Sequence, residues 1–148
     1  MTLEERVMAE LKEAMKAKDT VALDSIRAIK SAILLAKTDG SGLEINETRE
    51  IAILQKLVKS RRESLDIFES QKRPDLAERE RGQIAVIEKF LPQQLSPAEV
   101  EVILSAVIAE VGASSLKDMG KVMTAASQKL AGKADGRMIS EIVKKLLA

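Results

Sequence analysis

The chain has 148 residues, of which 45% are hydrophobic and 32% are charged, and its formal net charge is +1. This length suffices for one ordinary domain or two small ones with hydrophobic cores. The sequence contains no Cys, His, Trp or Tyr. Catalytic pairs of Ser or Cys with His are therefore excluded, as are zinc sites built from Cys or His. We expect no catalytic residues, no metal and no cofactor.

The first residues and the apolar runs bear on the cellular compartment. The chain begins Met-Thr-Leu-Glu-Glu-Arg, which lacks the basic and apolar character of a signal peptide. No apolar run approaches the ~18 residues of a membrane-spanning helix. The absence of Cys fits a reducing compartment. We therefore expect a cytoplasmic protein that does not bind a membrane.

The first two helices are delimited by capping residues. Thr2 and Glu5 form a capping box, which predicts a helix that begins near residue 3 and ends near Lys18. Asp19 is the N-cap of the next helix, which extends to about Lys37. Both segments carry apolar residues at helical spacing, so each should bury one face.

Two longer helices follow a loop at residues 38–42, which read Thr-Asp-Gly-Ser-Gly. Asn46 caps the third predicted helix, which extends to about Gln71. Pro74 opens the fourth, where its missing amide hydrogen costs nothing, and that helix ends at Pro92. Four helices joined by short turns predict an antiparallel pair of hairpins or a loose bundle.

Three shorter helices are predicted after the segment between Pro92 and Pro97. Each has its own start and stop signals. These are a capping box at Ser96 and Glu99, a stop at Gly112, a start at Ser115 with Asp118, a stop at Gly132, and an N-cap at Asp135. The fold class is thus all-α, with a four-helix N-terminal subdomain over residues 1–93 and a three-helix C-terminal subdomain over residues 94–148.

The C-terminal part of the chain is basic. Residues 112–148 hold seven Lys or Arg and three carboxylates, a net charge of +4, whereas residues 1–111 carry −3. This excess indicates an anionic partner. A solvated lysine face on a small helical domain is the alternative interpretation.

Glycines stand beside lysines twice in this basic part. In Gly-Lys-Ala-Asp-Gly at 132–136, helix capping explains both glycines and Asp135, and only Lys133 is left without a structural role. Gly120 precedes Lys121 near a helix start, where either a neighbouring helix packs against the glycine or a ligand approaches its backbone. Gly82, inside the fourth helix, likewise either permits close packing or costs about 1 kcal/mol without a gain.

Arg61 has an unusual position for a charged residue. On a helical wheel it lies between Val58, Leu65 and Phe68, within the stripe that should face the core. A buried ion pair with a carboxylate of a neighbouring helix would explain it. Alternatively the stripe borders a cleft, in which Arg61 and its basic neighbours would present cations to phosphate.

Several motifs of the chain together resemble the YqeY family. They occupy residues 90–96, 112–113, 118–123 and 132–136, and four residues of the third helix match too: Lys59, Arg61, Glu63 and Ser64. The C-terminal part is also similar to the tail domain of the GatB component of the aspartyl/glutamyl-tRNA amidotransferase. The resemblance covers nearly the full chain.

This resemblance implies an all-helical protein whose tail contacts tRNA or an amidotransferase-like complex. It also implies the label of a carbon-nitrogen ligase with glutamine as amide donor, although the kinase-like catalytic domain of the GatB component has no counterpart in 148 helical residues. We therefore predict a binding module that is not an enzyme by itself. The candidate RNA-binding residues are Lys121, Lys133, Arg137, Lys129 and Lys144. The alternative is an adaptor for a protein partner in tRNA metabolism.

Overall fold

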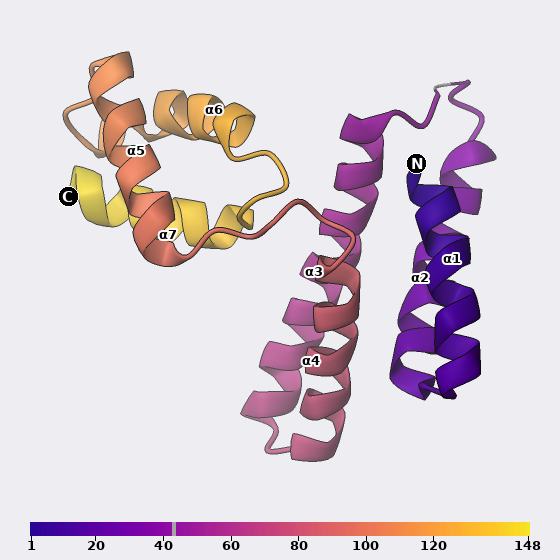
Figure 1. The fold of residues 1–148 in the computed structure, drawn as a ribbon. Coiled ribbons are helices and arrows are strands. Elements are labelled where there is room, and N and C mark those ends of the chain that lie inside the picture. The colour runs from indigo at the N-terminus through magenta and orange to yellow at the C-terminus, as the bar shows by residue number, and fades with distance from the viewer. Residues whose placement is uncertain (43) are drawn as a thin grey trace. The chain divides into compact units, whose positions relative to one another are not determined.

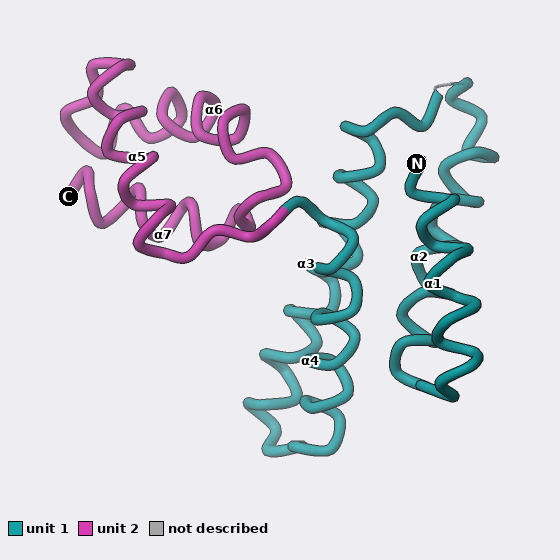
Figure 2. Tube along the Cα trace, viewed as in Figure 1, with its two compact units in different colours: residues 1–92 teal, residues 93–148 magenta. Residues whose placement is uncertain are grey.

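The computed structural model describes residues 1–42 and 44–148. The chain divides into two compact units, residues 1–92 and residues 93–148, coloured separately in Figure 2. The described residues form seven α-helices and one short 3-10 turn and contain no strand, so the predicted all-α class is confirmed. None of the helices in the described part of the chain combines the length and apolar character needed to cross a membrane.

The N-terminal unit consists of four helices: α1 (Leu3–Ala17), α2 (Thr20–Lys37), α3 (Glu47–Ser70) and α4 (Pro74–Glu88). Figure 1 shows α1 beside α2 and α3 beside α4, and α2 also packs against α3 and α4. The core is built from the apolar stripes that face one another. Its largest fully buried side chains are Val7, Ile29, Leu54 and Ile87.

The predicted caps of the first three helices are confirmed. Thr2 and Glu5 form the capping box of α1, Asp19 accepts from the amide of Ala22, and Asn46 accepts from the amide of Arg49. Because these side chains satisfy amides that have no partner within the helix, they fix where each helix begins.

The end of α4 differs from the prediction, because the helix stops at Glu88 and not at Pro92. The amide of Phe90 donates to the carbonyl of Ile87 at 3.0 Å, and the amide of Leu91 donates to that of Glu88 at 3.1 Å. The last residues thus form a tight turn, as expected before a proline, which disfavours a helical residue in front of it. This turn buries Phe90 in the core of the N-terminal unit.

Gly82 permits close packing of two helices. A Cβ atom added at this position would lie 3.0 Å from Cγ1 of Val21 on α2. That distance is shorter than ordinary van der Waals contact, so a side chain here would have to displace Val21. Of the two interpretations of Gly82, the structure supports the one based on packing.

Arg61 is partly buried on the side of α3 that faces α4, but its partner differs from the expected carboxylate. Its Nε donates to Oε1 of Gln83 at 2.9 Å, and its Nη1 donates to the carbonyl of Leu57 at 3.2 Å. Within the described residues no carboxylate lies within salt-bridge distance of Arg61, whereas the adjacent Arg62 pairs with Glu88 at 2.6 Å. A neutral amide satisfies the guanidinium without the cost of burying a second charge.

Replacing Arg61 with Ala should destabilise the protein by about 1–3 kcal/mol, since it leaves the side chain of Gln83, which is 8% exposed, without its donor. Replacing Arg61 and Gln83 together with Leu should cost less than Arg61→Ala alone, because no buried polar group is then left unpaired. Urea unfolding measures both, with Lys59→Ala at an exposed position of α3 as the control. Equal losses for Arg61→Ala and the control would contradict this role.

The C-terminal unit packs three helices against one another: α5 (Pro97–Val111), α6 (Met119–Lys129) and α7 (Gly136–Leu147). Its fully buried side chains include Val100, Leu104, Val107, Val122, Leu130 and Val143. Gly112 has a φ of +69° and ends α5, as predicted.

The start of α6 is more irregular than the sequence indicates. Ser115 and Asp118 form a capping box around the 3-10 turn η1 (Leu116–Asp118), and the α-helix begins only at Met119. The Asp118 carboxylate accepts hydrogen bonds from the amides of Ser114 and Ser115, which precede α6. Its side chain therefore does not cap the first amides of α6.

Candidate nucleic-acid interface

All five candidate RNA-binding residues lie in the C-terminal unit, and all are exposed. They occupy its last two helices and the loop between them. Lys121 and Lys129 belong to the first and last turns of α6, Lys133 to the loop, and Arg137 and Lys144 to the first and last turns of α7.

The loop that carries Lys133 is held by hydrogen bonds on both sides of this residue. The amide of Lys133 donates to the carbonyl of Leu130 at 2.8 Å, and its own carbonyl accepts from the amide of Leu95 at 2.9 Å. Gly132, with a φ of +75°, and Ala134 are both buried. The backbone of Lys133 is thus fixed between two buried residues, and its side chain remains exposed.

Gln94 contributes to this loop in a way that the sequence did not reveal. Its Nε2 donates to the carbonyl of Gly132 at 2.6 Å, so the side chain and the following Leu95 amide together hold the 132–133 segment. In the sequence, Gln94 reads as part of a polar connector between two prolines. Only one feature of the sequence pointed to this contact: residues 90–96 and 132–136 both belong to the motifs shared with the YqeY family. The spacing of these segments does not indicate that they touch.

Asp135 occupies the N-terminus of α7. Its Oδ1 accepts from the amide of Met138 at 2.8 Å, which is the predicted capping interaction. An anion beside Lys133 therefore finds one of the first amides of this helix already bonded to a carboxylate. Binding would have to depend on the lysine side chains.

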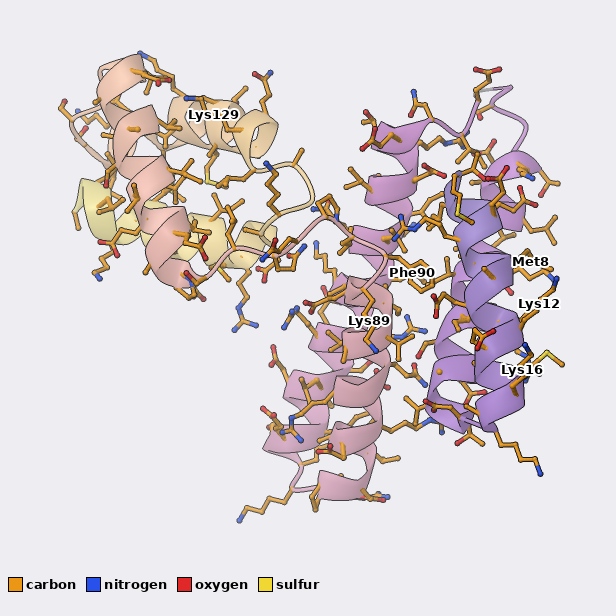
Figure 3. The ribbon with its side chains drawn as sticks, in the orientation of Figure 1. Met8, Lys12, Lys16, Lys89, Phe90 and Lys129 are labelled. Carbon is orange, nitrogen blue, oxygen red and sulfur yellow. The ribbon has the colours of Figure 1, made fainter. Side chains whose placement is uncertain are left out.

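Two of the five cations are paired within the unit. Lys129, labelled in Figure 3, contacts Glu110 through both carboxylate oxygens at 2.9 and 3.0 Å, and Arg137 pairs with Glu141 at 3.4 Å. Such exposed pairs contribute little and can open when a partner binds. In the part of the chain that the structure describes, Lys121, Lys133 and Lys144 have no carboxylate within salt-bridge distance.

Asp118 lies near Lys121 and reduces the positive charge around it. The amides of Ser114 and Ser115 donate to its carboxylate at 2.9 and 3.3 Å, and together with the charge of Lys121 they lower its pKa below the ordinary 3.8. Asp118 is therefore ionised at neutral pH. In the same unit, bonds from the backbone and side chain of Ser96 lower the pKa of Glu99 below 4.5.

These two depressed pKa values predict that the C-terminal unit loses stability in acid. A carboxylate whose pKa is lower in the folded state contributes its full stabilisation above its unfolded pKa and loses it as the pH falls through the folded pKa. The loss should start below about pH 4.5, the ordinary value for Glu99, and continue below the 3.8 of Asp118. Thermal melts across this range should show a flatter decline for Asp118→Asn; an unchanged decline would contradict the assignment.

Gly120 and Gly136 lie at the starts of α6 and α7 with open space above their Cα atoms. A Cβ added at either position would meet no atom within 4 Å. Packing of a neighbouring helix therefore does not explain Gly120, in contrast to Gly82. The approach of a partner to the backbone is the interpretation that remains from the sequence.

The N-terminal unit has an open pocket of about 430 Å³ between α1, α2 and the end of α4. At one end the Arg6 guanidinium lies 5.4 Å from the centre of the Phe90 ring and donates to the Phe90 carbonyl at 3.1 Å. The lining of the pocket combines apolar side chains with charged groups of both signs. The described residues contain no cluster of three acidic side chains that could hold a metal ion. The lining includes Ala14, Ala17, Ala22, Ile26 and Val86, with Glu10, Glu13, Asp19 and Lys89 among the charged residues.

Three curated proteins similar to this chain share the name altered inheritance of mitochondria protein 41, mitochondrial. That of Lachancea thermotolerans is 33% identical over 118 residues, which cover 76% of this chain and 63% of that protein. That of Pyrenophora tritici-repentis is 29% identical, covering 93% and 69%. That of Saccharomyces cerevisiae is 31% identical, covering 63% and 50%. The chain thus spans 50–69% of these relatives' lengths.

The names of these relatives include no enzymatic activity and place them in mitochondria. The motifs predict membership of the YqeY family, and the family match extends over both units of the fold. The model of the Yqey-like proteins matches residues 4–147, almost the whole length, and the chain therefore belongs to the YqeY family.

Proposed function

We propose that this YqeY-family protein is a tRNA-contacting module that binds phosphates with the lysines of its C-terminal unit. The observation that supports this most directly is the loop of Lys133. Its backbone is bonded at both the amide and the carbonyl, while its exposed side chain has no carboxylate within salt-bridge distance among the described residues. A cation that is fixed at its base and solvated at its tip suits a phosphate contact.

The chemistry of the surface defines the kind of readout. With neither Tyr nor Trp in the chain, bases have little to stack on, so recognition would use the shape and phosphates of the RNA. Lys121, Lys133 and Lys144 would make the main contacts, and Lys129 and Arg137 would join once their exposed ion pairs open. Binding should be weak and should decrease steeply with salt.

A protein-binding adaptor is the second candidate, and the charge balance of the whole C-terminal unit favours it. Residues 93–148 hold seven Lys or Arg and six carboxylates, a net charge of only +1. A unit with so small an excess of cations attracts a phosphate backbone only weakly, so its charge balance favours a protein partner over RNA. In this case the partner would be an enzyme of tRNA metabolism.

The proposal assigns no catalytic step to the chain, so the amidotransferase-like activity implied by the family label would belong to a partner. Glutamine-dependent carbon-nitrogen ligation needs groups that activate a carboxyl and release ammonia, and with neither Cys nor His the sequence lacks the usual pairs of nucleophile and base. The proposal keeps the cytoplasmic location expected from the sequence. Since the relatives are named as mitochondrial, fractionation of the source cells should precede any search for partners.

A pulldown from native lysate, repeated after ribonuclease treatment, distinguishes the two candidates. Direct binding to purified tRNA, followed by fluorescence anisotropy at low salt, tests the proposal itself. We expect a complex with tRNA that dissociates as salt rises. Protein partners that persist after ribonuclease, together with no binding of purified tRNA, would instead support the adaptor.

A further inference from the structure

Large exposed apolar side chains gather on the hairpin of α1 and α2. Met8, Met15 and Leu34 are exposed by 40%, 57% and 61%, and Leu35 on α2 is exposed by 69%. Ile67 on α3 and Val102 on α5 are also exposed, but each stands alone among acidic neighbours in the sequence. Single exposed apolar residues are normal on a protein surface, whereas a cluster marks an interaction site.

The spacing of the residues places this cluster on one side of the hairpin. A salt bridge between Glu4 and Lys37 brings the start of α1 beside the end of α2. One turn further along each helix come Met8 on α1 and Leu34 on α2, at positions i+4 and i−3 from the bridge. The next turns supply Lys12 on α1 and Lys30 on α2, followed by Met15 and Arg27.

We call these six residues, Met8, Lys12, Met15, Arg27, Lys30 and Leu34, the basic-apolar face. Figure 3 shows Met8 and Lys12 along the outer side of α1. Apolar side chains and cations alternate along this face. Its two methionines are long and flexible enough to adapt to an irregular surface.

The cations of the face are not neutralised by the hairpin itself. Lys12, Arg27 and Lys30 have no carboxylate within salt-bridge distance in the described residues. The carboxylates of α1 and α2 are occupied elsewhere or lie on the other flank. Glu4 pairs with Lys37, Glu5 belongs to the capping box, Glu13 pairs with Lys16, Asp19 caps α2, Asp24 pairs with Arg79, and Glu10 lines the pocket.

We infer that the basic-apolar face binds the surface of an anionic lipid bilayer. Cations beside projecting apolar side chains match the boundary between anionic headgroups and acyl chains, where both kinds of group are satisfied together. RNA fits less well, because phosphates gain nothing from methionine and leucine. A partner helix usually binds in a groove. The pocket lined by α1 lies on the other flank of that helix, where Glu10 and Glu13 are found, and not on the basic-apolar face.

This binding would be peripheral and reversible. Each Lys or Arg near an anionic surface raises the partition coefficient about fivefold, and partly exposed Met and Leu side chains add a contribution that salt does not screen. Peripheral binding of this kind departs from the expectation of no membrane partner but needs no membrane-spanning helix, and none is found among the described residues. It is independent of the proposed tRNA contact, which uses the other unit.

Sedimentation with vesicles tests the inference on the full chain. We expect binding to vesicles of phosphatidylglycerol and phosphatidylcholine, and far weaker binding to phosphatidylcholine alone. The double variant Lys12→Gln, Lys30→Gln should lower the partition coefficient about 25-fold, from about fivefold for each charge. Met8→Ser with Leu34→Ser should also weaken binding, including at high salt.

Matched control variants distinguish binding through this face from non-specific binding through other exposed apolar or basic residues. Ile67→Ser with Val102→Ser removes similarly exposed apolar groups elsewhere. Lys117→Gln with Lys145→Gln removes two exposed cations of the other unit that are not among the proposed tRNA contacts. Both double variants should leave vesicle binding unchanged. Circular dichroism confirms that each variant is folded. Absence of binding to the anionic vesicles, or equal losses in the controls, would overturn the inference. The inference would also be overturned if the protein bound an acidic amphipathic helical peptide but did not bind the vesicles.

Discussion

Replacing Leu104 with Ala should unfold residues 93–148 while residues 1–92 stay folded. Leu104 on α5 is fully buried among Val107, Val122 and Val143. Removing so many buried atoms costs about 2–5 kcal/mol, and a core of this size rarely supplies more than about 3–5 kcal/mol. The variant should therefore be largely unfolded in the smaller unit. The same variant should no longer bind tRNA.

Limited proteolysis followed by mass spectrometry measures this effect. We expect cleavage sites throughout residues 93–148 of Leu104→Ala and a protected fragment close to residues 1–92. Val102→Ala, on the same helix but at a 72% exposed position, is the matched control and should remain resistant. Loss of both units together would contradict independent folding, which the division of the chain suggests but which stays a prediction.

The fold was largely predictable because capping residues act locally. Thr2, Asp19, Asn46, Ser96 and Asp135 each bond to an amide within three residues of themselves, so short sequence patterns suffice to place these helix starts. The errors occurred where the local signal was weaker. The end of α4 depends on a tight turn before Pro92, and the start of α6 on an intervening 3-10 turn.

Contacts between distant segments were much less predictable. The wheel position of Arg61 indicated a buried guanidinium but could not choose between a carboxylate and the amide of Gln83, 22 residues away. The hydrogen bond from Gln94 to Gly132 joins residues 38 apart, and no periodicity links them. Gly82 and Gly120 look alike in the sequence, but their surroundings in the structure differ. Only Gly82 is in close contact with another helix.

The most direct test of the proposed function is the salt dependence of tRNA binding after Lys121 and Lys133 are both replaced with Gln. Each phosphate contact in a duplex-like stem contributes about 0.9 to the slope of log affinity against log salt, so losing two should reduce the slope by up to about 1.8. Affinity at low salt should fall as well. Glu110 already compensates Lys129, so Lys129→Gln should have a smaller effect than either lysine of the double variant. An unchanged affinity and slope in the double variant would contradict the phosphate-binding surface and favour the protein adaptor.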